Sequence, residues 1–424
     1  MPLRPTRATK ALALFVLTAA QAVSAADADL GALSLQSASP DKQAVAEPTK
    51  AFIEAAAGTG RPREGTGWQG LGRLTLDVRH GDALAASVRY ALSVRLDATS
   101  PKDWRVDNPV LSLREALVGW QDSDAANLLD FGRINLRDGP AYGYNPTDFF
   151  RDNALRTITT ANPFMLRENR LGTVMFRGQH LWSDGSISLA LAPKLASRRS
   201  SHGLNPDWGA TNSRQRALAT VNNRWGDAFS SQLLLYKEQE SSARWGVNAT
   251  TLLSDAVTAH AEWTRSREPD LLTRALALSA TGVTRNRAAI GLTYTTATKL
   301  SLTTEVHYNG FALDREAVRA LPNLDQRAPA AYFGTTLSLQ DNAARNALLV
   351  YVTQRDLVVK NLELTGFAKF NRDDGSRLLW LELRYRMDRV EWSMQLQHSS
   401  GDDASEFSFI PIRSSISLTA TTYF

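Results

Sequence analysis

The chain has 424 residues, no cysteine, and 48 basic against 43 acidic side chains. The absence of cysteine excludes disulfides, thiolate metal sites and a lipid-modified N-terminal cysteine. The near balance of charge excludes a basic nucleic-acid arm, so we expect no nucleic-acid partner. Length alone allows two or three soluble domains or one large β domain.

Residues 1–25 have the pattern of an export signal. Basic residues in the first ten positions precede a short apolar run at 11–20, and Ala25 closes a motif of small residues. The run is too short for a membrane helix, which needs about 20 apolar residues. We therefore expect cleavage after Ala25 or Ala26. The mature chain would then be periplasmic, secreted, or an outer-membrane barrel.

Residues 26–66 differ in composition from the rest of the chain. They are rich in Ala, Ser, Asp, Pro and Gly, with a short helix at 51–57 as one candidate element. We expect a periplasmic N-terminal extension or a small plug, with disorder as the alternative. This stretch is too small to form the folded plug domain of a TonB-dependent receptor.

From residue 67 to 424 the chain alternates between apolar and polar residues. In 379–388 the odd positions are Leu, Leu, Leu, Tyr and Met, while the even ones are Trp, Glu, Arg, Arg and Asp. This period of two indicates strands, because a helix repeats every 3.6 residues. A soluble sandwich also alternates. Charged polar faces, tight hairpins, aromatics near strand ends and a chain that stops within a strand favour an all-β, antiparallel transmembrane barrel.

The alternating runs predict about 16–18 strands. They lie at 68–99, 109–137, 170–193, 214–267, 287–309, 330–370 and 377–424. One conflict follows from this assignment. Barrels keep their long loops outside, but counting back from the C-terminus puts the long segments 268–284 and 311–329 on the periplasmic side. A strand near 310–340 is therefore missed, split or merged.

The last segment, 413–424, ends in an aromatic residue that follows apolar residues at alternating positions. Ile416, Leu418 and Phe424 share one face. This pattern resembles the assembly signal of Gram-negative outer-membrane β-barrels of porin-like type, although no specific family is identified. The resemblance implies Sec export, insertion by the barrel assembly machinery, and surroundings of outer-membrane lipid and lipopolysaccharide.

A barrel this wide is not filled by its own side chains. The expected function is therefore a porin-like channel for passive passage of small hydrophilic or amphipathic solutes. Because rings of arginine select for anions, we expect a mild anion preference. The alternative is that each arginine pairs with a carboxylate and sets no selectivity. The candidate pore-lining residues are Arg73, Arg79, Arg89, Arg95, Arg133, Arg137, Arg177, Glu262, Glu305, Glu382, Arg384 and Arg386.

The longest irregular stretch, 138–169, is rich in aromatics, and loops of this length are commonly functional. We expect it to fold into the lumen and narrow the pore, with an ordinary surface loop as the alternative. Its candidate constriction residues are Asp138, Asp148, Arg151, Asp152 and Arg156. Gly132-Arg133 followed by the residues at 145–148 resembles a motif of porin-like families encoded with exporters. That implies a second candidate function, an export component working with an inner-membrane pump.

We expect no catalysis, cofactor or metal site. His260 shares a face with Glu262, and His307 with Glu305, but no serine nucleophile motif or HExxH metal motif occurs. Polar lining of the lumen explains both pairs. A barrel-wall enzyme acting on lipid or peptide would need a serine or aspartate close to His260 or His307. The sequence leaves the oligomeric state open.

Overall fold

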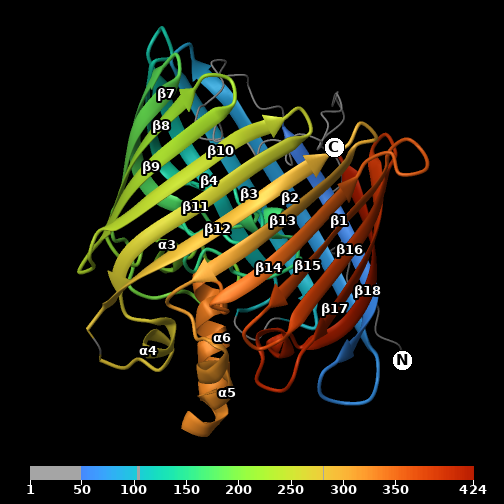
Figure 1. Ribbon diagram of the computed structural model, residues 1–424. Helices are drawn as coiled ribbons and strands as arrows, with labels where there is room; N and C mark the ends of the chain where they lie inside the picture. Colours follow the sequence, from blue (N-terminus) through green and yellow to red (C-terminus); the bar gives the residue numbers. More distant parts are fainter. Residues whose placement is uncertain (1–48, 103–105, 280) are drawn as a thin grey trace, which may run out of the picture.

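The computed structural model describes residues 49–102, 106–279 and 281–424. These residues form a closed antiparallel sheet of 18 strands, in which β1 pairs with both β2 and β18 (Figure 1). At the closing seam, Phe52 of β1 lies opposite Tyr423 of β18. The expected antiparallel β-barrel is confirmed. The predicted signal peptide, 1–25, lies outside the described residues.

The strands follow one another around the barrel in chain order. The first nine are β1 (Lys50–Pro62), β2 (Gln69–Ala85), β3 (Val88–Ser100), β4 (Val110–Gln121), β5 (Asn127–Ile134), β6 (Thr173–Trp182), β7 (Gly185–Ala192), β8 (Arg216–Trp225) and β9 (Phe229–Glu238). The others are β10 (Arg244–Ser254), β11 (Val257–Glu268), β12 (Val283–Thr295), β13 (Leu300–Asn309), β14 (Asn346–Gln354), β15 (Leu362–Asn371), β16 (Arg377–Arg386), β17 (Val390–Ser400) and β18 (Ile412–Tyr423).

Alternation gives the wall an apolar outer face and a polar inner face. On β12 and β13, Ile290 and Val306 are 61% and 59% exposed, whereas Glu305 and His307 are 1% and 0% exposed. Successive side chains of a strand point to opposite faces, so this contrast repeats along the wall. The exposed apolar belt is the surface that a lipid bilayer requires of a barrel.

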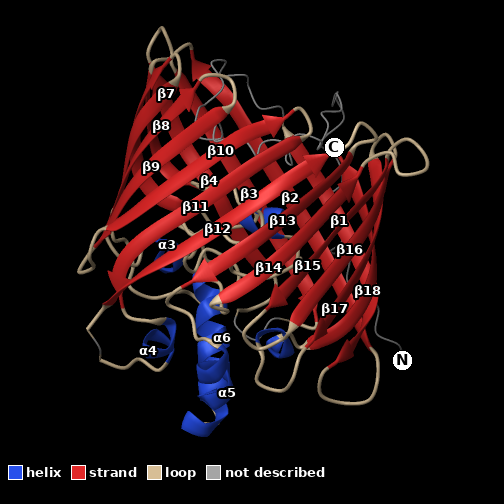
Figure 2. Cartoon of the chain, in the orientation of Figure 1, coloured by secondary structure: helices blue, strands red, loops and turns tan. Residues whose placement is uncertain are grey.

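The two ends of the barrel differ in their connections (Figure 2). Short turns such as 86–87, 183–184 and 255–256 lie at one end, which we call the short-turn end. Loops 135–172, 193–215 and 310–345 lie at the other, the long-loop end. In bacterial barrels the long loops face the outside.

The predicted strand beginning at 330 is wrong, because this segment is helical. Helices α5 (Arg315–Leu324) and α6 (Ala328–Leu339) fill loop 310–345, and β14 starts only at Asn346. Tyr332, Thr336 and Leu339 are buried at helical spacing. Without the extra strand, 268–284 and 311–329 both belong to the long-loop end, which removes the conflict in the strand count.

The predicted boundary of the N-terminal extension is also wrong. Residues 50–62 form β1, so the barrel begins before residue 67 and the candidate helix at 51–57 does not form. This segment is rich in alanine, which has low intrinsic strand propensity. Pairing with β2 and β18 on both sides overrides that propensity and closes the sheet.

The remaining helical elements lie in the long loops. They are α2 (Pro163–Glu168), α3 (Trp208–Thr211), α4 (Leu271–Ala275) and the 3-10 helix η3 (Glu406–Phe409). Helices α4, α5 and α6 share an apolar cluster that includes Leu271, Leu321 and Tyr332. No helix in the described ranges is long and apolar enough to cross a bilayer.

The three predicted assembly-signal residues lie at the seam of the barrel. Ile416, Leu418 and Phe424 are 40%, 52% and 51% exposed. The backbone N–H of Phe424 donates to the carbonyl of Ala51 at 2.9 Å, so the last residue still pairs with β1. Their role in assembly remains a prediction.

Candidate functional site

Loop 135–172 joins β5 to β6 and crosses the inside of the barrel. On one side, Arg79 of β2 binds Glu168 of the loop at 3.1 Å, and Arg114 of β4 donates to Asn169 at 3.2 Å. On the other side, the loop backbone binds Glu262 of β11. Strands β2 and β11 stand half a turn apart in the ring of 18 strands. The loop therefore bridges opposite walls.

Glu262 is the first of two carboxylates that hold the loop. It is 1% exposed and accepts from the backbone N–H of Ala141 at 2.7 Å, from the amide of Asn145 at 2.9 Å and from the hydroxyl of Thr147 at 2.8 Å. Gly139 passes close to this carboxylate with φ +91°, and a Cβ there would collide with it. A glycine is therefore required where the loop enters the lumen.

Glu305 on β13 is the second anchor. It accepts from the backbone N–H groups of Tyr142 and Gly143 at 2.6 and 2.9 Å. It also binds Nε2 of His260 at 2.7 Å and Nε2 of His307 at 2.9 Å. An ionised carboxylate only accepts, so each Nε2 carries a hydrogen. A carboxylate with four donors in a dry site is a strong, directional anchor.

These anchors correct our view of the two histidine–carboxylate pairs. Polar lining of the lumen was the expected explanation, but His260, Glu262, Glu305 and His307 are all at most 2% exposed. Both histidines bind Glu305 rather than a serine hydroxyl. The pairs therefore hold the loop and do not face water.

A second set of contacts ties loop 135–172 to loop 310–345. Asp341 of the latter accepts from the hydroxyl of Tyr144 at 2.7 Å and from Arg151 at 3.1 Å, and it pairs with Arg287 of β12 at 3.0 Å. Burial alone would raise the pKa of Asp341. The guanidinium groups of Arg287 and Arg151 outweigh this effect and hold the pKa below its usual range.

Asp138 and Asp148 are two buried carboxylates of loop 135–172. Asp148 pairs with Arg170 at 2.6 Å, while Asp138 accepts from the amide of Gln232 at 3.1 Å. Burial, reinforced by repulsion from Asp148, raises the pKa of Asp138 to about 6. Ionisation of Asp138 is therefore unfavourable in the folded loop.

Most of the other predicted constriction residues hold the loop to neighbouring parts of the barrel. Arg156 is 3% exposed and donates to the carbonyls of Leu111 and His202 at 2.6 and 2.8 Å, which ties the loop to loop 193–215. Arg151 is bound to Asp341 as described above. Asp152 is partly buried, and burial raises its pKa although Arg274 and Arg151 act in the opposite direction.

The predicted pore-lining arginines are largely paired with carboxylates. Arg73 binds Glu54 at 2.7 Å, Arg89 binds Asp130 at 2.6 Å, Arg95 binds Asp97 at 2.9 Å, Arg386 binds Glu391 at 2.9 Å, and Arg384 binds Glu382. In several pairs the cation is the more exposed partner. The side chain of Arg89 is 31% exposed against 9% for Asp130, and that of Arg386 is 32% against 8% for Glu391.

Three predicted lining arginines lie in different settings. Arg133 is 0% exposed and donates to the carbonyls of Pro206 and Asp207, so it anchors loop 193–215 instead of facing the pore. Arg137 is exposed near the end of β5. Arg177 is partly exposed and lies on the face of β6 opposite the outward-facing Phe176.

The sequence reasoning missed Arg114 and Arg287. Arg114 is 1% exposed and holds Asp77 through two nitrogens, at 2.5 and 2.7 Å. A bulge in the β3–β4 pairing shifts the alternation near Arg114, which hid its inward direction. Arg287 shares the inner face of β12 with Ala289 and Gly291, whereas Ile290 is on the outer face. This alternation could have predicted from the sequence that Arg287 points into the barrel.

The chain matches no protein-family model and no curated protein. Among solved structures it is similar to the crystal structure of Acinetobacter baumannii OccAB1, with TM-score 0.57 and 11% identity over 91% of this chain and 98% of that chain. It is also similar to Pseudomonas aeruginosa OccK11 (OpdR), with TM-score 0.51 and 11% identity over 89% and 96%. For P. aeruginosa OccK10 (OpdN) the TM-score is 0.51, with 12% identity over 89% and 99%. These likenesses confirm the expected porin-type barrel fold.

Proposed function

We propose that this protein is an outer-membrane channel through which small hydrophilic or amphipathic solutes pass without covalent chemistry. The observation that carries the proposal is the placement of loop 135–172. A closed wall with polar residues inside surrounds a loop that is fastened to opposite strands by Arg79 and Glu262. A loop held in this way narrows a wide barrel to a defined cross-section.

Several buried carboxylates fix the loop, and none of them can be released without leaving other buried groups unpaired. Glu262 and Glu305 each bind several donors of the segment 141–147, and Asp341 fixes Tyr144 and Arg151 from the neighbouring loop. Releasing one anchor would leave buried polar groups unpaired, which costs about 1–3 kcal/mol for each neutral group. We therefore infer that the loop is a permanent constriction and sets the size limit for solutes.

The proposal includes a mild preference for anions. Most lumenal arginines have a carboxylate partner, which argues for a small effect. In the pairs Arg89–Asp130 and Arg386–Glu391, however, the guanidinium is the partner that faces water. A passing solute therefore meets the positive member of each pair first, and the field near the wall favours anions.

Liposome swelling tests the size limit. Vesicles that contain the protein should swell in isosmotic solutions of monosaccharides and swell much more slowly with larger oligosaccharides. Vesicles with an E262Q/E305Q double variant should admit the larger sugars faster, because the loop is loosened. Equal rates for all sugars in both proteins would contradict a constricting role for the loop.

The reversal potential in a potassium chloride gradient tests the charge preference. We expect a sign that indicates chloride over potassium for the natural protein and a smaller preference for R89Q/R386Q. The matched control is R265Q, because Arg265 is exposed on the face of β11 opposite Glu262. Cation selectivity in the natural protein would contradict the proposed preference.

A further inference from the structure

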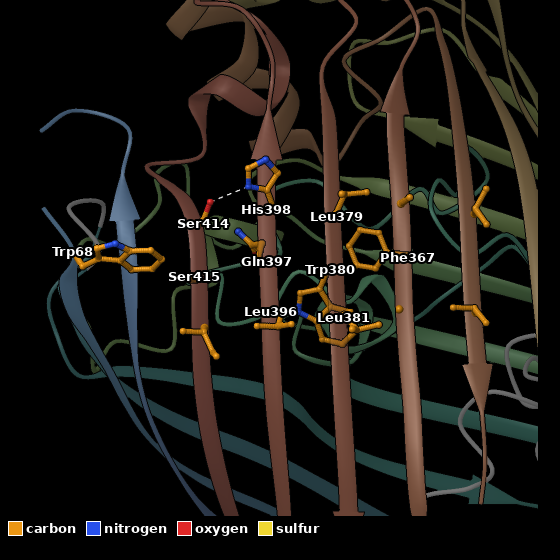
Figure 3. A pocket seen from close by; sticks show the side chains of 15 residues that line it. Trp68, Phe367, Leu379, Trp380, Leu381, Leu396, Gln397, His398, Ser414 and Ser415 are labelled. Carbon is orange, nitrogen blue, oxygen red and sulfur yellow. Dashed lines mark hydrogen bonds between the residues drawn. The ribbon is translucent and has the colours of Figure 1, made fainter. Parts of the chain in front are cut away.

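The lipid-facing surface of the barrel contains an apolar trough of about 560 Å³ (Figure 3). We call it the β15 trough. Its lining side chains include Val350, Val352, Ala368, Leu379, Leu381, Leu396 and Ile416. Figure 3 shows Trp68 reaching from the start of β2 toward the edge of the trough near Ser415. The exposed fractions of Leu379, Leu381 and Ile416, 38–40%, show that this surface lies outside the barrel.

The trough exists because β15 carries small residues on its outer face. Gly366 and Ala368 stand between Val350 and Val352 of β14 and Leu379 and Leu381 of β16. On β12 and β13, by contrast, the larger side chains of Ile290 and Val306 lie side by side. The missing side-chain volume leaves a depression suited to an alkyl chain, since burying apolar surface of each methylene group contributes about 0.8 kcal/mol.

Polar and positive groups lie at the long-loop end of the trough. Nδ1 of His398 and Oγ of Ser414 are hydrogen-bonded at 2.8 Å (Figure 3). The charges of Arg413, Arg377 and Arg63 act electrostatically on His398. Arg377 lies two positions before Leu379 and is exposed, and its Nε donates to Ser400 at 2.9 Å. Within the described part of the chain, neither Arg377 nor Arg413 pairs with a carboxylate.

We propose that the β15 trough binds one acyl chain of a phosphate-bearing outer-leaflet lipid of the lipid A type, with its phosphate held by Arg377. The groups along the trough match the chemistry of such a lipid. An apolar depression leads to a hydrogen-bonding pair and then to Arg377, which is on the outward face of β16 and has no acidic partner among the described residues. Arginine suits phosphate because its planar fork presents several donors. The site is independent of the pore and goes beyond the proposed channel function.

Native mass spectrometry of the purified full chain in detergent tests the site. The probes are bis-phosphorylated lipid A and the same lipid after enzymatic removal of its phosphates. We expect one tightly retained lipid A per chain, and retention about tenfold weaker for the dephosphorylated lipid. R377Q should weaken lipid A binding and leave the dephosphorylated lipid unaffected, which separates the headgroup contribution from the acyl contribution.

The second test is a substitution whose larger side chain fills the trough. A368L should lower retention of both lipids about tenfold. A261L is the matched control, because Ala261 also lies on the lipid-facing side, but on β11. Folding of each variant is checked by heat-modifiable migration on gels. Unchanged retention by A368L, equal retention of the two lipids, or a dimer that A368L abolishes would each overturn the proposal, the last by showing that a second copy fills the trough.

Discussion

The carboxylate of Glu305 on β13 accepts the backbone N–H of Tyr142 at 2.6 Å, although 163 positions separate the two residues in the chain. Glu262 makes the equivalent bond to Ala141 over 121 positions. Two strand carboxylates thus hold consecutive backbone groups of the loop. The same site contains His260 and His307, so the loop is fixed by a buried polar network and not by a single bond.

Removing the acceptor character of Glu305 should loosen the loop. In E305Q the amide cannot accept at both oxygen positions, and His260 or His307 then faces a donor. We expect a loss of about 2–4 kcal/mol in the free energy of unfolding, because bonds to a buried charge are broken. Urea unfolding in detergent measures the change. The exposed substitution E316Q on α5 is the control, and an equal stability of E305Q and natural protein would contradict the anchoring role.

Gly139 should not tolerate alanine. Its φ of +91° disfavours a side chain, and a Cβ would collide with the carboxylate of Glu262. We expect G139A to lose about 2–3 kcal/mol, through backbone strain and the displaced anchor. G226A separates the two effects, since Gly226 has φ +66° but open space around its Cβ position. Similar losses for both variants would mean that the contact with Glu262 does not matter.

The pH dependence of stability should reflect Asp138. Its pKa in the folded protein, about 6, lies above the ordinary value of 3.8, so the folded state binds the proton more tightly than the unfolded state. The stabilisation is present below pH 4 and is lost as the pH rises through about 6. D138N should therefore be more stable than the natural protein at pH 7.5 and similar at pH 4. Thermal unfolding at both values, with D124N as control, measures the difference; no gain at pH 7.5 would contradict the raised pKa.

The pair Arg114–Asp77 should behave as a buried ion pair. D77N leaves Arg114 without an acidic partner among the described residues and should lower stability by about 3–5 kcal/mol. R114M should cost less, because Asp77 keeps Arg95 and Arg79 at 3.4 and 3.5 Å. The double variant should recover part of the loss caused by D77N, because Arg114 no longer leaves an unpaired charge in the buried site. A double-mutant cycle of unfolding free energies measures the coupling. Additive effects of the two substitutions would show that the pair is not coupled.

The barrel could be predicted from the sequence because its signal is local. A period of two along each strand separates Leu379 and Leu381 from Trp380 and Glu382, and no knowledge of the partners is needed. Strand β1 was missed because its alanines carry little local signal, and pairing with β18 decides its structure. Helix α6 was misread because its apolar residues also suit a short strand.

The anchors of the loop could be predicted only in part. The alternation placed Glu262, Glu305 and both histidines on the inner face, and the length of loop 138–169 indicated a functional segment. The contact between them depends on bonds across more than 100 positions, such as Ala141 to Glu262. Their burial also depends on the loop, so residues expected to face water proved to lie beneath it.

Single-channel recording in a planar bilayer tests the central claim most directly. We predict discrete, ohmic conductance steps for the natural protein and larger, noisier steps for E262Q/E305Q, in which the constriction is released. A natural protein that inserts and migrates as a folded barrel but conducts no ions, with the double variant equally silent, would contradict a water-filled pore narrowed by loop 135–172.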